Sequence, residues 1–487
     1  MTQIPLTFHT SRTSARRGWA AFWLAHDGFL ADQQKRRGVG HAFGTYRTPA
    51  AEAPVDIFLL PEDLRHHAVL LGGTGSGKSS LLETLARLHL GTRQGFALLD
   101  LHGDLFTRVA AWVLHANVRR PVVYLDFTQP DCLPGWNPLT PWPDVDAGRQ
   151  VDCLVGVLKR LYADERLASW SWGIKVHEVI SWTLRACLES TLPATLVDLR
   201  QFLLLPALRR RLLATVRPET RAYFGRFGPR EQQYVSAVLN KLDPFLGSLA
   251  VQRFLGVPTS TFDLMRVIDD GTLLLVNLAK GHLGPTADIL GRLLVNVLEL
   301  AALRRGRQPP ETRTPYSILL DEAHNLADMD SGLEDLLVAA RKYRVYVTLA
   351  AQSLSLFPPR FRPHLLGNTE RQYFFRLPFS EAKTLAPDLF EPLGSVFRAA
   401  IRPTDRLDDP LLTPVEELKA FTQDLAHLPT GACLWSLRTK RYKARRIQLT
   451  KPDALPFTPA VLADRLRAAM LARLHPPDPR APSDLPF

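Results

Sequence analysis

A glycine-rich loop constrains this chain more than any other feature of its sequence. Residues 72–80 read GGTGSGKSS and match the pattern GxxxxGK[ST]. The apolar run at 68–73 predicts a strand before the loop, and the residues after it have helical spacing. This strand–loop–helix context predicts a P-loop. The alternative is a glycine-rich turn that binds no nucleotide.

The loop supplies each kind of group that holds a triphosphate. Its glycines let consecutive backbone N–H groups curl around phosphates, and the following helix directs its positive end at the same anion. We expect Lys78 to contact the phosphates and the Ser79 hydroxyl to bind Mg²⁺. The predicted cofactors are ATP and Mg²⁺, and the predicted nucleotide-binding residues are Gly72, Gly73, Thr74, Gly75, Ser76, Gly77, Lys78, Ser79 and Ser80.

Two acidic residues end a second apolar run. The stretch YSILLDEAH at 316–324 predicts a buried strand that carries Asp321 and Glu322 at its carboxyl end, where α/β sheets bind ligands. We expect Asp321 to complete the Mg²⁺ shell. Glu322 is the candidate catalytic base, which polarises the water that attacks the γ-phosphate. Adjacent acids after a strand can instead cap a helix.

A third apolar run, VYVTLAAQS at 345–353, has polar residues on both sides. Gln352 follows it and is placed either to sense the γ-phosphate or to end the strand in a turn. Arg341, Lys342 and Arg344 precede it at the end of a predicted helix, where the helix dipole favours cations. Alternatively, an arginine of this group reaches a neighbouring subunit's phosphate site and accelerates hydrolysis.

Apolar runs alternate with helical stretches along most of the chain, which predicts an α/β fold with a central, mostly parallel sheet. The predicted strands are 68–73, 95–103, 121–127, 272–279, 316–324, 345–352 and 372–377. The predicted domains are an N-terminal lead-in (1–55), an ATPase core (56–138 and 271–450), an inserted all-helical subdomain (139–270), and a C-terminal helix with a disordered Pro-rich tail (451–487).

The charge balance favours a polyanionic partner. Sixty Lys and Arg residues against 48 Asp and Glu residues give a net charge of +12, which indicates nucleic acid or only an arginine-rich background. Residues 432–449 predict an edge hairpin whose basic side chains bind DNA or prevent edge pairing. A further basic cluster either binds phosphates and bases or is a solvated helix face. It comprises Arg200, Arg209, Arg210, Arg211, Arg217, Arg221 and Arg226 among Tyr223, Phe224 and Phe227.

The cysteines and the early apolar stretch argue against a zinc-binding, disulfide-bonded or membrane-spanning protein. Four cysteines without CxxC spacing indicate neither a zinc ribbon nor a disulfide framework, and they fit a reducing cytosol. The stretch at 18–30 is too short for a membrane span and contains His26 and Asp27. It predicts a packing helix or an amphipathic helix on a membrane or partner surface. We predict a cytoplasmic protein without a membrane span.

The order of the motifs resembles the HerA/FtsK superfamily of hexameric DNA-pumping ATPases, most closely the type IV coupling proteins. The similarity covers residues 56–400, through the P-loop, LLDLHGDL, VVYLDFTQPDCLPGWNPL, ILLDEAHNL, ARKYRVYVTLAAQS and GNTERQYFFRL. It implies a RecA-like P-loop NTPase core and gives Lys78, Ser79, Asp321, Glu322 and Gln352 the roles stated above. It also places Asp100 and His102 near the nucleotide, makes Arg341 a subunit-bridging catalytic residue, and likens the insertion to the coupling-protein all-alpha domain.

Two departures from the family pattern accompany this resemblance. Val338 and Ala340 stand before RKY, in a stretch where the family commonly has a further arginine and a glycine. The paired transmembrane helices of membrane coupling proteins are also not evident, which implies a free translocase or one docked on a membrane partner.

Three classes of function fit these patterns. The first is an ATP-hydrolysing DNA translocase, a homo-hexameric ring that moves DNA. The second is an ATPase that delivers protein or nucleoprotein in a secretion or phage-defence system, with a membrane-complex or defence-system partner. The third is a nucleotide-gated scaffold that hardly hydrolyses ATP, and Glu322 argues against it. No base-reading module is evident, so sequence-specific DNA recognition is not predicted.

Overall fold

The computed structural model describes residues 29–46, 54–92, 94–142, 145–161, 173–327, 332–390, 413–437 and 444–474. The chain divides into two compact units, each formed from discontinuous segments. The P-loop unit comprises Met1–Thr92, Asp321–His324 and Tyr346–Ala454, and the insertion unit comprises Arg93–Leu320, Asn325–Val345 and Leu455–Phe487.

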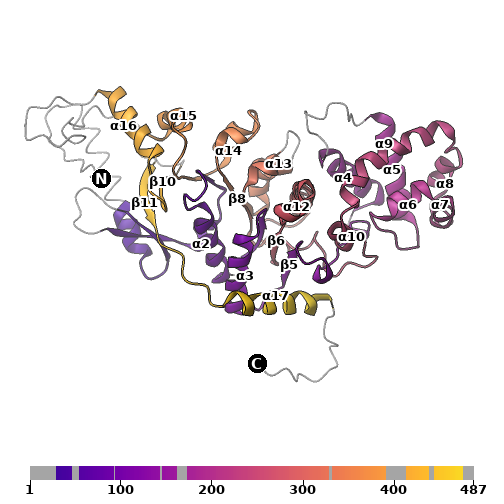
Figure 1. Ribbon diagram of the computed structural model, residues 1–487, viewed down its shortest axis with the longest axis horizontal. Coiled ribbons are helices and arrows are strands. Elements are labelled where there is room, and N and C mark those ends of the chain that lie inside the picture. Colours follow the sequence, from indigo (N-terminus) through magenta and orange to yellow (C-terminus); the bar gives the residue numbers. More distant parts are fainter. Residues whose placement is uncertain are drawn as a thin grey trace, which may run out of the picture. The chain divides into compact units, whose positions relative to one another are not determined.

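The P-loop unit is built on a mixed sheet (Figure 1). Its strands lie in the order β2 (Val55–Leu59), β1 (His41–Tyr46), β11 (Ala444–Leu449), β10 (Ala432–Leu437), β9 (Arg371–Phe374), β3 (Ala68–Leu71) and β8 (Val345–Ala351). β3 runs parallel to β8 and β9, with Leu71 opposite Ala351 and Phe374. Its helices are η1 (Pro61–Leu64), α2 (Lys78–Leu90), η7 (Leu354–Leu356), α14 (Phe361–Asn368), α15 (Phe379–Leu389) and α16 (Pro414–Ala426), while η5 (Ala323–Asn325) begins in this unit.

The prediction of an edge hairpin at 432–449 is wrong. β10 and β11 do pair with each other, but β10 also pairs with β9 and β11 with β1. β1 reaches this place because Gly44 lets the backbones approach closely: a Cβ there would lie 2.7 Å from the Gln448 carbonyl oxygen. Both described strands of the hairpin are therefore interior, and Arg445 and Arg446 on β11 do not protect a sheet edge.

The insertion unit is built on a parallel sheet. Its strands lie in the order β7 (Tyr316–Leu320), β4 (Gly95–Asp100), β6 (Leu273–Asn277) and β5 (Val122–Asp126). All residues of β4, β6 and β7 are buried, as expected for parallel strands covered on both faces. Helices near this sheet are α3 (Asp104–Ala116), η2 (Pro130–Cys132), α11 (Lys280–Leu283), α12 (Pro285–Arg304), η4 (Arg305–Arg307), α13 (Gly332–Ala339), η6 (Ala340–Tyr343) and α17 (Pro459–Leu474).

A helical segment interrupts the alternation between β5 and β6 (Figure 1). Its helices are α4 (Ala147–Leu161), α5 (Ile174–Glu189), α6 (Asp198–Leu204), α7 (Pro206–Leu213), α8 (Pro218–Gly225), α9 (Pro229–Leu246) and α10 (Leu249–Leu255). α5 is central and contacts α4, α6, α7, α8 and α9. The Tyr223 ring stacks on Trp182 with centroids 4.8 Å apart, and Phe224 is buried. The aromatic residues of the basic cluster thus contribute to packing within this segment.

The predicted α/β fold with a mostly parallel central sheet is confirmed, since each predicted apolar strand corresponds to one of β3–β9. The early apolar stretch up to residue 28 and the Pro-rich tail beyond residue 474 lie outside the described residues. Along the described parts of the chain, no helix combines the length and apolar character needed to cross a membrane. The four cysteines all lie in described segments and form no disulfide there, and Cys132, Cys187 and Cys433 are buried.

Candidate active site

The P-loop is anchored to β8 and to the segment that follows β9. The Gly72 N–H donates to the Ala351 carbonyl at 3.2 Å, and the Gly73 N–H donates to the Arg376 carbonyl at 2.9 Å. Gly75 and Gly77 adopt φ angles of 70° and 117°, a region that favours glycine. The loop therefore turns sharply from the end of β3 into α2.

The start of β10 supports the loop from one side. The Gly431 N–H donates to the Ser76 carbonyl at 2.9 Å. A Cβ at Gly77 would lie 3.2 Å from both Gly431 Cα and Phe375 Cε1. Because of this close approach, Gly77 is required for its small size as well as for its backbone angle. Gly431 and Phe375 were not identified from the sequence, since nothing in their local pattern connects them to the loop.

Lys78 begins α2 and is buried inside the loop. Its ammonium donates to the Gly72 and Gly73 carbonyls at 2.7 and 3.2 Å. Burial lowers the pKa of Lys78, while the carboxylates of Glu322 and Asp321 act in the opposite direction. A buried cation surrounded by loop backbone is suited to binding an anion.

Ser79 and Asp321 meet although 242 positions separate them in the sequence. The Ser79 hydroxyl donates to Asp321 Oδ2 at 3.1 Å. A hydroxyl and a single carboxylate suit Mg²⁺, which usually keeps several waters and takes further oxygens from phosphates. The buried Ser76 hydroxyl has no hydrogen-bond partner within the described chain, so the loop also offers an unused polar group. The residues fit a phosphate-bound Mg²⁺.

Glu322 lies between two polar side chains. Gln352 Nε2 donates to its Oε1 at 3.3 Å, and His324 Nδ1 lies 3.4 Å from its Oε2. Glu322 has a φ of 49°, which is uncommon for a residue other than glycine, and such backbones concentrate at functional sites. No role for His324 was predicted from the sequence. The spacing of DEAH could have indicated one, because a histidine two residues after the acid lies within reach of it.

Asp100 has a structural role. Its carboxylate accepts hydrogen bonds from the His102 and Phe106 backbone N–H groups, each at 2.9 Å, and it is 1% exposed. These contacts fix the turn from β4 into α3. His102 itself is exposed.

The three basic residues around η6 have different environments. Arg344 donates to the Arg313 carbonyl at 3.0 Å, and the Lys342 ammonium lies 4.9 Å from the centre of the Tyr343 ring. Arg341 is exposed, and its side chain has no hydrogen bond or ion pair with any described residue. Arg341 and Lys342 are both exposed, and of these two only Lys342 contacts an aromatic ring of the described chain, so Arg341 is the better candidate to meet another molecule.

Some arginines of the basic cluster in the helical segment have polar contacts within the described chain, and others have none. Arg200 pairs with Asp243 at 2.8 Å, Arg209 and Arg221 donate to nearby carbonyls, and Arg217 lies 3.8 Å from Glu189. The remaining members are exposed and have no ion pair with a described residue. They are Arg210, Arg211 and Arg226.

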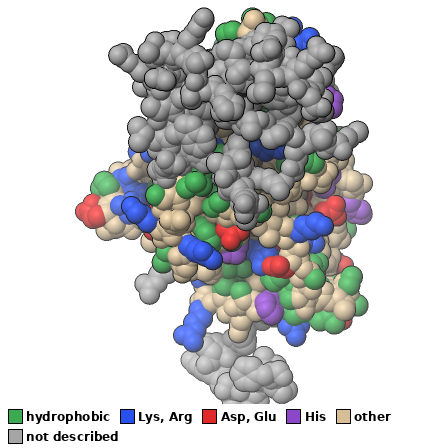
Figure 2. All heavy atoms as spheres, turned by 90° about the vertical axis from the view of Figure 1, so that its left-hand side faces the viewer, with side chains coloured by type: hydrophobic (Ala, Val, Ile, Leu, Met, Phe, Trp, Pro, Cys, Tyr) green, Lys and Arg blue, Asp and Glu red, His purple; other side chains and the backbone are tan. Residues whose placement is uncertain are grey.

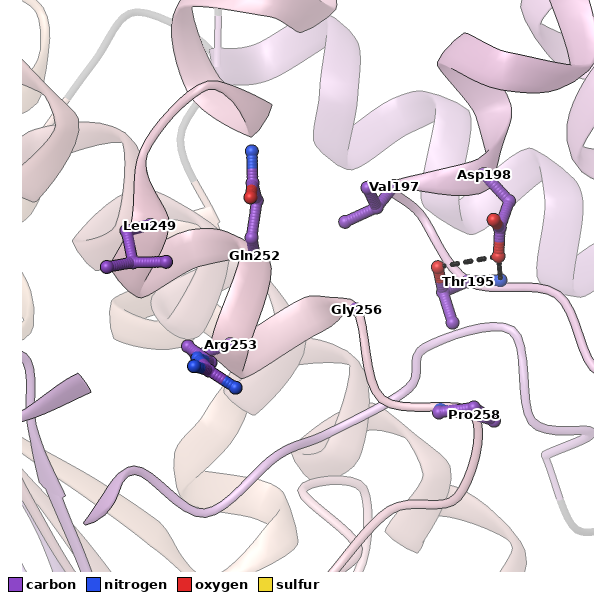
Figure 3. A pocket seen from close by; sticks show the side chains of 8 residues that line it. All are labelled: Thr195, Val197, Asp198, Leu249, Gln252, Arg253, Gly256 and Pro258. Atoms are coloured by element: carbon purple, nitrogen blue, oxygen red, sulfur yellow. Dashed lines mark hydrogen bonds between the residues drawn. The ribbon is translucent and has the colours of Figure 1, made fainter. Parts of the chain in front are cut away.

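Two surface features do not add to the site. A hollow of about 450 Å³ in the helical segment is lined by residues of α6, α10 and their flanking loops (Figure 3). There Asp198 accepts from the backbone N–H and hydroxyl of Thr195, both at 2.8 Å, so its carboxylate serves the local fold. On the face shown in Figure 2, the described Lys and Arg side chains that are visible lie among acidic and apolar ones and do not form one continuous basic patch.

Comparison with solved structures identifies the fold. The bacterial conjugative coupling protein TrwBdeltaN70, in its unbound monoclinic form, matches with a TM-score of 0.58 and 18% identity over 89% of this chain and 93% of that chain. The chain has the coupling-protein fold. TrwB in complex with the ATP analogue ADPNP matches with a TM-score of 0.56 and 17% identity, over 83% and 90% of the two chains.

A differently named solved protein also matches this fold. VirB4 of Thermoanaerobacter pseudethanolicus matches with a TM-score of 0.53 and 14% identity, over 88% of this chain and 98% of that chain. No family model and no curated protein sequence matches the chain. At these identities the comparisons establish the fold, and the resemblance to coupling proteins is confirmed at that level.

Proposed function

We propose that this protein is a P-loop ATPase that acts as a DNA-translocating motor of the coupling-protein type. The observation that carries the proposal is the contact of Ser79 with Asp321 beside Glu322, at the end of a P-loop whose lysine is buried. Coupling protein TrwB, which has this fold, is described with ADPNP and with ADP and Mg²⁺.

The roles of the residues follow from these positions. The loop N–H groups and Lys78 would hold the phosphates of ATP, and Ser79 and Asp321 would hold Mg²⁺. When bound, Mg²⁺ neutralises charge on the phosphate oxygens. Glu322 would accept a proton from water and orient it for in-line attack. Gln352, already hydrogen-bonded to Glu322, would hold that carboxylate in place and relay the state of the γ-phosphate.

The assembly that we propose is a homo-hexameric ring in which Arg341 completes the site of a neighbouring subunit. Its exposure and lack of an ion partner within the described chain support this role. An arginine supplied across a subunit boundary stabilises the charge of the transition state. Within each subunit we retain the domains predicted from the sequence: lead-in, core, helical insertion and C-terminal segment. Cysteines without disulfides in the described chain and the need for ATP are consistent with the cytoplasm.

The cargo that we propose is DNA, because the chain is basic and the exposed Arg210, Arg211 and Arg226 are available to phosphates. The second candidate that we propose is an ATPase that delivers protein or nucleoprotein through a secretion or defence apparatus, because the same nucleotide site would serve either cargo.

ATP turnover with and without DNA tests the proposal. We expect DNA to stimulate hydrolysis, and Glu322→Gln to lower kcat about 100-fold or more while ATP binding persists, because only the base is removed. Turnover without DNA stimulation would favour the second candidate. Equal turnover by Glu322→Gln would refute the assigned base.

A further inference from the structure

The backbone that carries Arg341 is fixed by contacts on the residues that follow it. The Ala340 side chain before it is 1% exposed, and Arg344 after it adopts a φ of 56° while its N–H donates to the Arg341 carbonyl at 3.0 Å. The next three carbonyls, of Lys342, Tyr343 and Arg344, each accept a hydrogen bond from another segment. Arg341 is thus an exposed side chain on a tightly held backbone.

Arg305, at the end of α12, holds the carbonyl of Tyr343. It is 1% exposed, and its Nη1 donates to the Tyr343 and Thr314 carbonyls at 3.2 and 2.6 Å. Its other nitrogens donate to the Ile268 carbonyl and to Asp269, both at 2.7 Å. One guanidinium therefore joins η6 to two other segments of the insertion unit.

Arg313 holds the carbonyl one residue earlier. Its Nη1 donates to the Lys342 carbonyl at 2.7 Å, and its Nε and Nη2 both donate to the Gln308 carbonyl, at 3.1 and 2.6 Å. The guanidinium also lies 5.5 Å from the centre of the Tyr343 ring. Arg344 in turn donates to the Arg313 carbonyl at 3.0 Å, so the two segments are bound in both directions.

Burying cations is a costly way to fill space, because apolar side chains of similar volume often stabilise a fold as well. What a guanidinium adds is several donors in a rigid planar arrangement. Here the donors reach consecutive carbonyls directly after Arg341. Such a frame matters where one exposed arginine must meet a reacting phosphate, since a displacement of about 1 Å can cost about 100-fold in rate.

We propose that Arg305 and Arg313 are positioning residues that fix the direction in which Arg341 leaves the insertion unit. The proposal rests on the proposed role of Arg341 in hydrolysis. It adds that the hydrogen bonds which Arg305 and Arg313 donate to the Tyr343 and Lys342 carbonyls determine where Arg341 meets the transition state. We call these two arginines the donor frame. Arg313 is the better test, because Arg305 has more buried contacts and its replacement threatens folding.

A double-mutant cycle on the full chain tests this inference. We expect Arg341→Ala to lower DNA-stimulated kcat about 100-fold or more and Arg313→Gln to lower it about tenfold, both with little change in KM. Because Arg313 acts through Arg341, Arg313→Gln should change kcat less than about twofold in the Arg341→Ala background. The same decrease in both backgrounds would overturn the proposal, because a merely structural role does not depend on Arg341.

Amide hydrogen exchange gives a readout that is independent of turnover. We expect exchange at 341–344 to accelerate in Arg313→Gln, and the matched Arg266→Gln to leave it unchanged, since Arg266 is exposed and pairs with Asp270. Unchanged exchange in Arg313→Gln would also overturn the proposal that Arg313 holds this backbone in place. Normal turnover in Arg341→Ala would remove the positioning role but leave the ATPase standing, whereas no turnover in the wild type would refute the proposed function itself.

Discussion

At the residue scale, Glu322, the proposed catalytic base, combines an unfavourable backbone with polar contacts to both of its carboxylate oxygens. Its left-handed φ of 49° disfavours any residue with a Cβ, whereas glycine adopts that region freely. Gln352 and His324 meet its two carboxylate oxygens. We infer that the strain is retained because the side chain is needed at this position.

This inference predicts an order of stabilities. Glu322→Gly should be more stable than Glu322→Ala by about 1 kcal/mol, because only alanine retains the strained Cβ. Both variants should be inactive. Chemical denaturation of the two variants measures the difference in the free energy of unfolding. An alanine variant as stable as the glycine variant would show that the φ angle carries no strain.

The lowered pKa of Lys78 predicts that nucleotide affinity depends on pH. Burial lowers the pKa of Lys78 from the ordinary 10.5, so the ammonium starts to lose its proton at a lower pH than an exposed lysine. Only the protonated form attracts phosphate. Affinity for a fluorescent ATP analogue should therefore fall as pH rises through this lowered pKa.

Glu322→Gln provides the check on that prediction. The Glu322 carboxylate raises the pKa of Lys78, so its neutralisation should move the fall in affinity to still lower pH. A fall that begins only at the ordinary lysine value would contradict the proposed effect of burial. In the folding equilibrium the sign is the opposite: the cost of burying the charged lysine is fully present below the lowered pKa and is relieved as pH rises from there to the ordinary 10.5 of the unfolded chain.

At the element scale, the apolar runs predicted where the buried strands lie, but they did not predict which strands pair with one another. Continuous apolar runs such as AVLLGG identify buried parallel strands whatever their partners are. β1 was missed because HAFGTY has a weak pattern and depends on pairing with β11, hundreds of residues later. The same long-range pairing turned a predicted edge hairpin into an interior one.

The helical segment contains arginines that pair with an acidic residue and arginines that do not, and their contributions to DNA binding can be tested separately. Replacing Arg210, Arg211 and Arg226 with Gln should weaken DNA binding and reduce the log–log salt slope by about 0.9 for each phosphate that the variant no longer binds. Arg200→Gln is the control, because Arg200 already pairs with Asp243. Fluorescence anisotropy at several salt concentrations measures both. An unchanged slope in the triple variant would make these arginines a solvated face.

At the scale of the whole molecule, a shared active site predicts recovery of turnover when two inactive variants are mixed. Arg341→Ala subunits retain Glu322, and Glu322→Gln subunits retain Arg341. If neighbours share sites in a ring with heterologous boundaries, about a quarter of the boundaries in an equal mixture hold both intact residues. Turnover should rise well above that of either variant alone.

Measured mass and ATP turnover together decide this prediction. The mixture should be assembled before assay, and each variant alone is the control. Hexamers that remain inactive after mixing would place Arg341 and Glu322 in the same subunit's site, whereas an active Arg341→Ala variant alone would exclude Arg341 from the site. A monomer with full wild-type turnover would exclude the ring.

The sequence alone determined the features that depend on neighbouring residues. The P-loop, the acidic pair after β7 and the glutamine after β8 are each a short pattern at the end of an apolar run, and backbone geometry within such a run is largely local. Tertiary structure decided which of these groups contact one another and which have a structural role instead. The contact of Ser79 with Asp321, the approach of His324 to Glu322, the capping role of Asp100 and the frame around Arg341 all join distant segments or depend on how a turn is packed. The partners that come from distant segments, such as Asp321 for Ser79 and Arg313 for the Lys342 carbonyl, are set by long-range packing, which local spacing does not record.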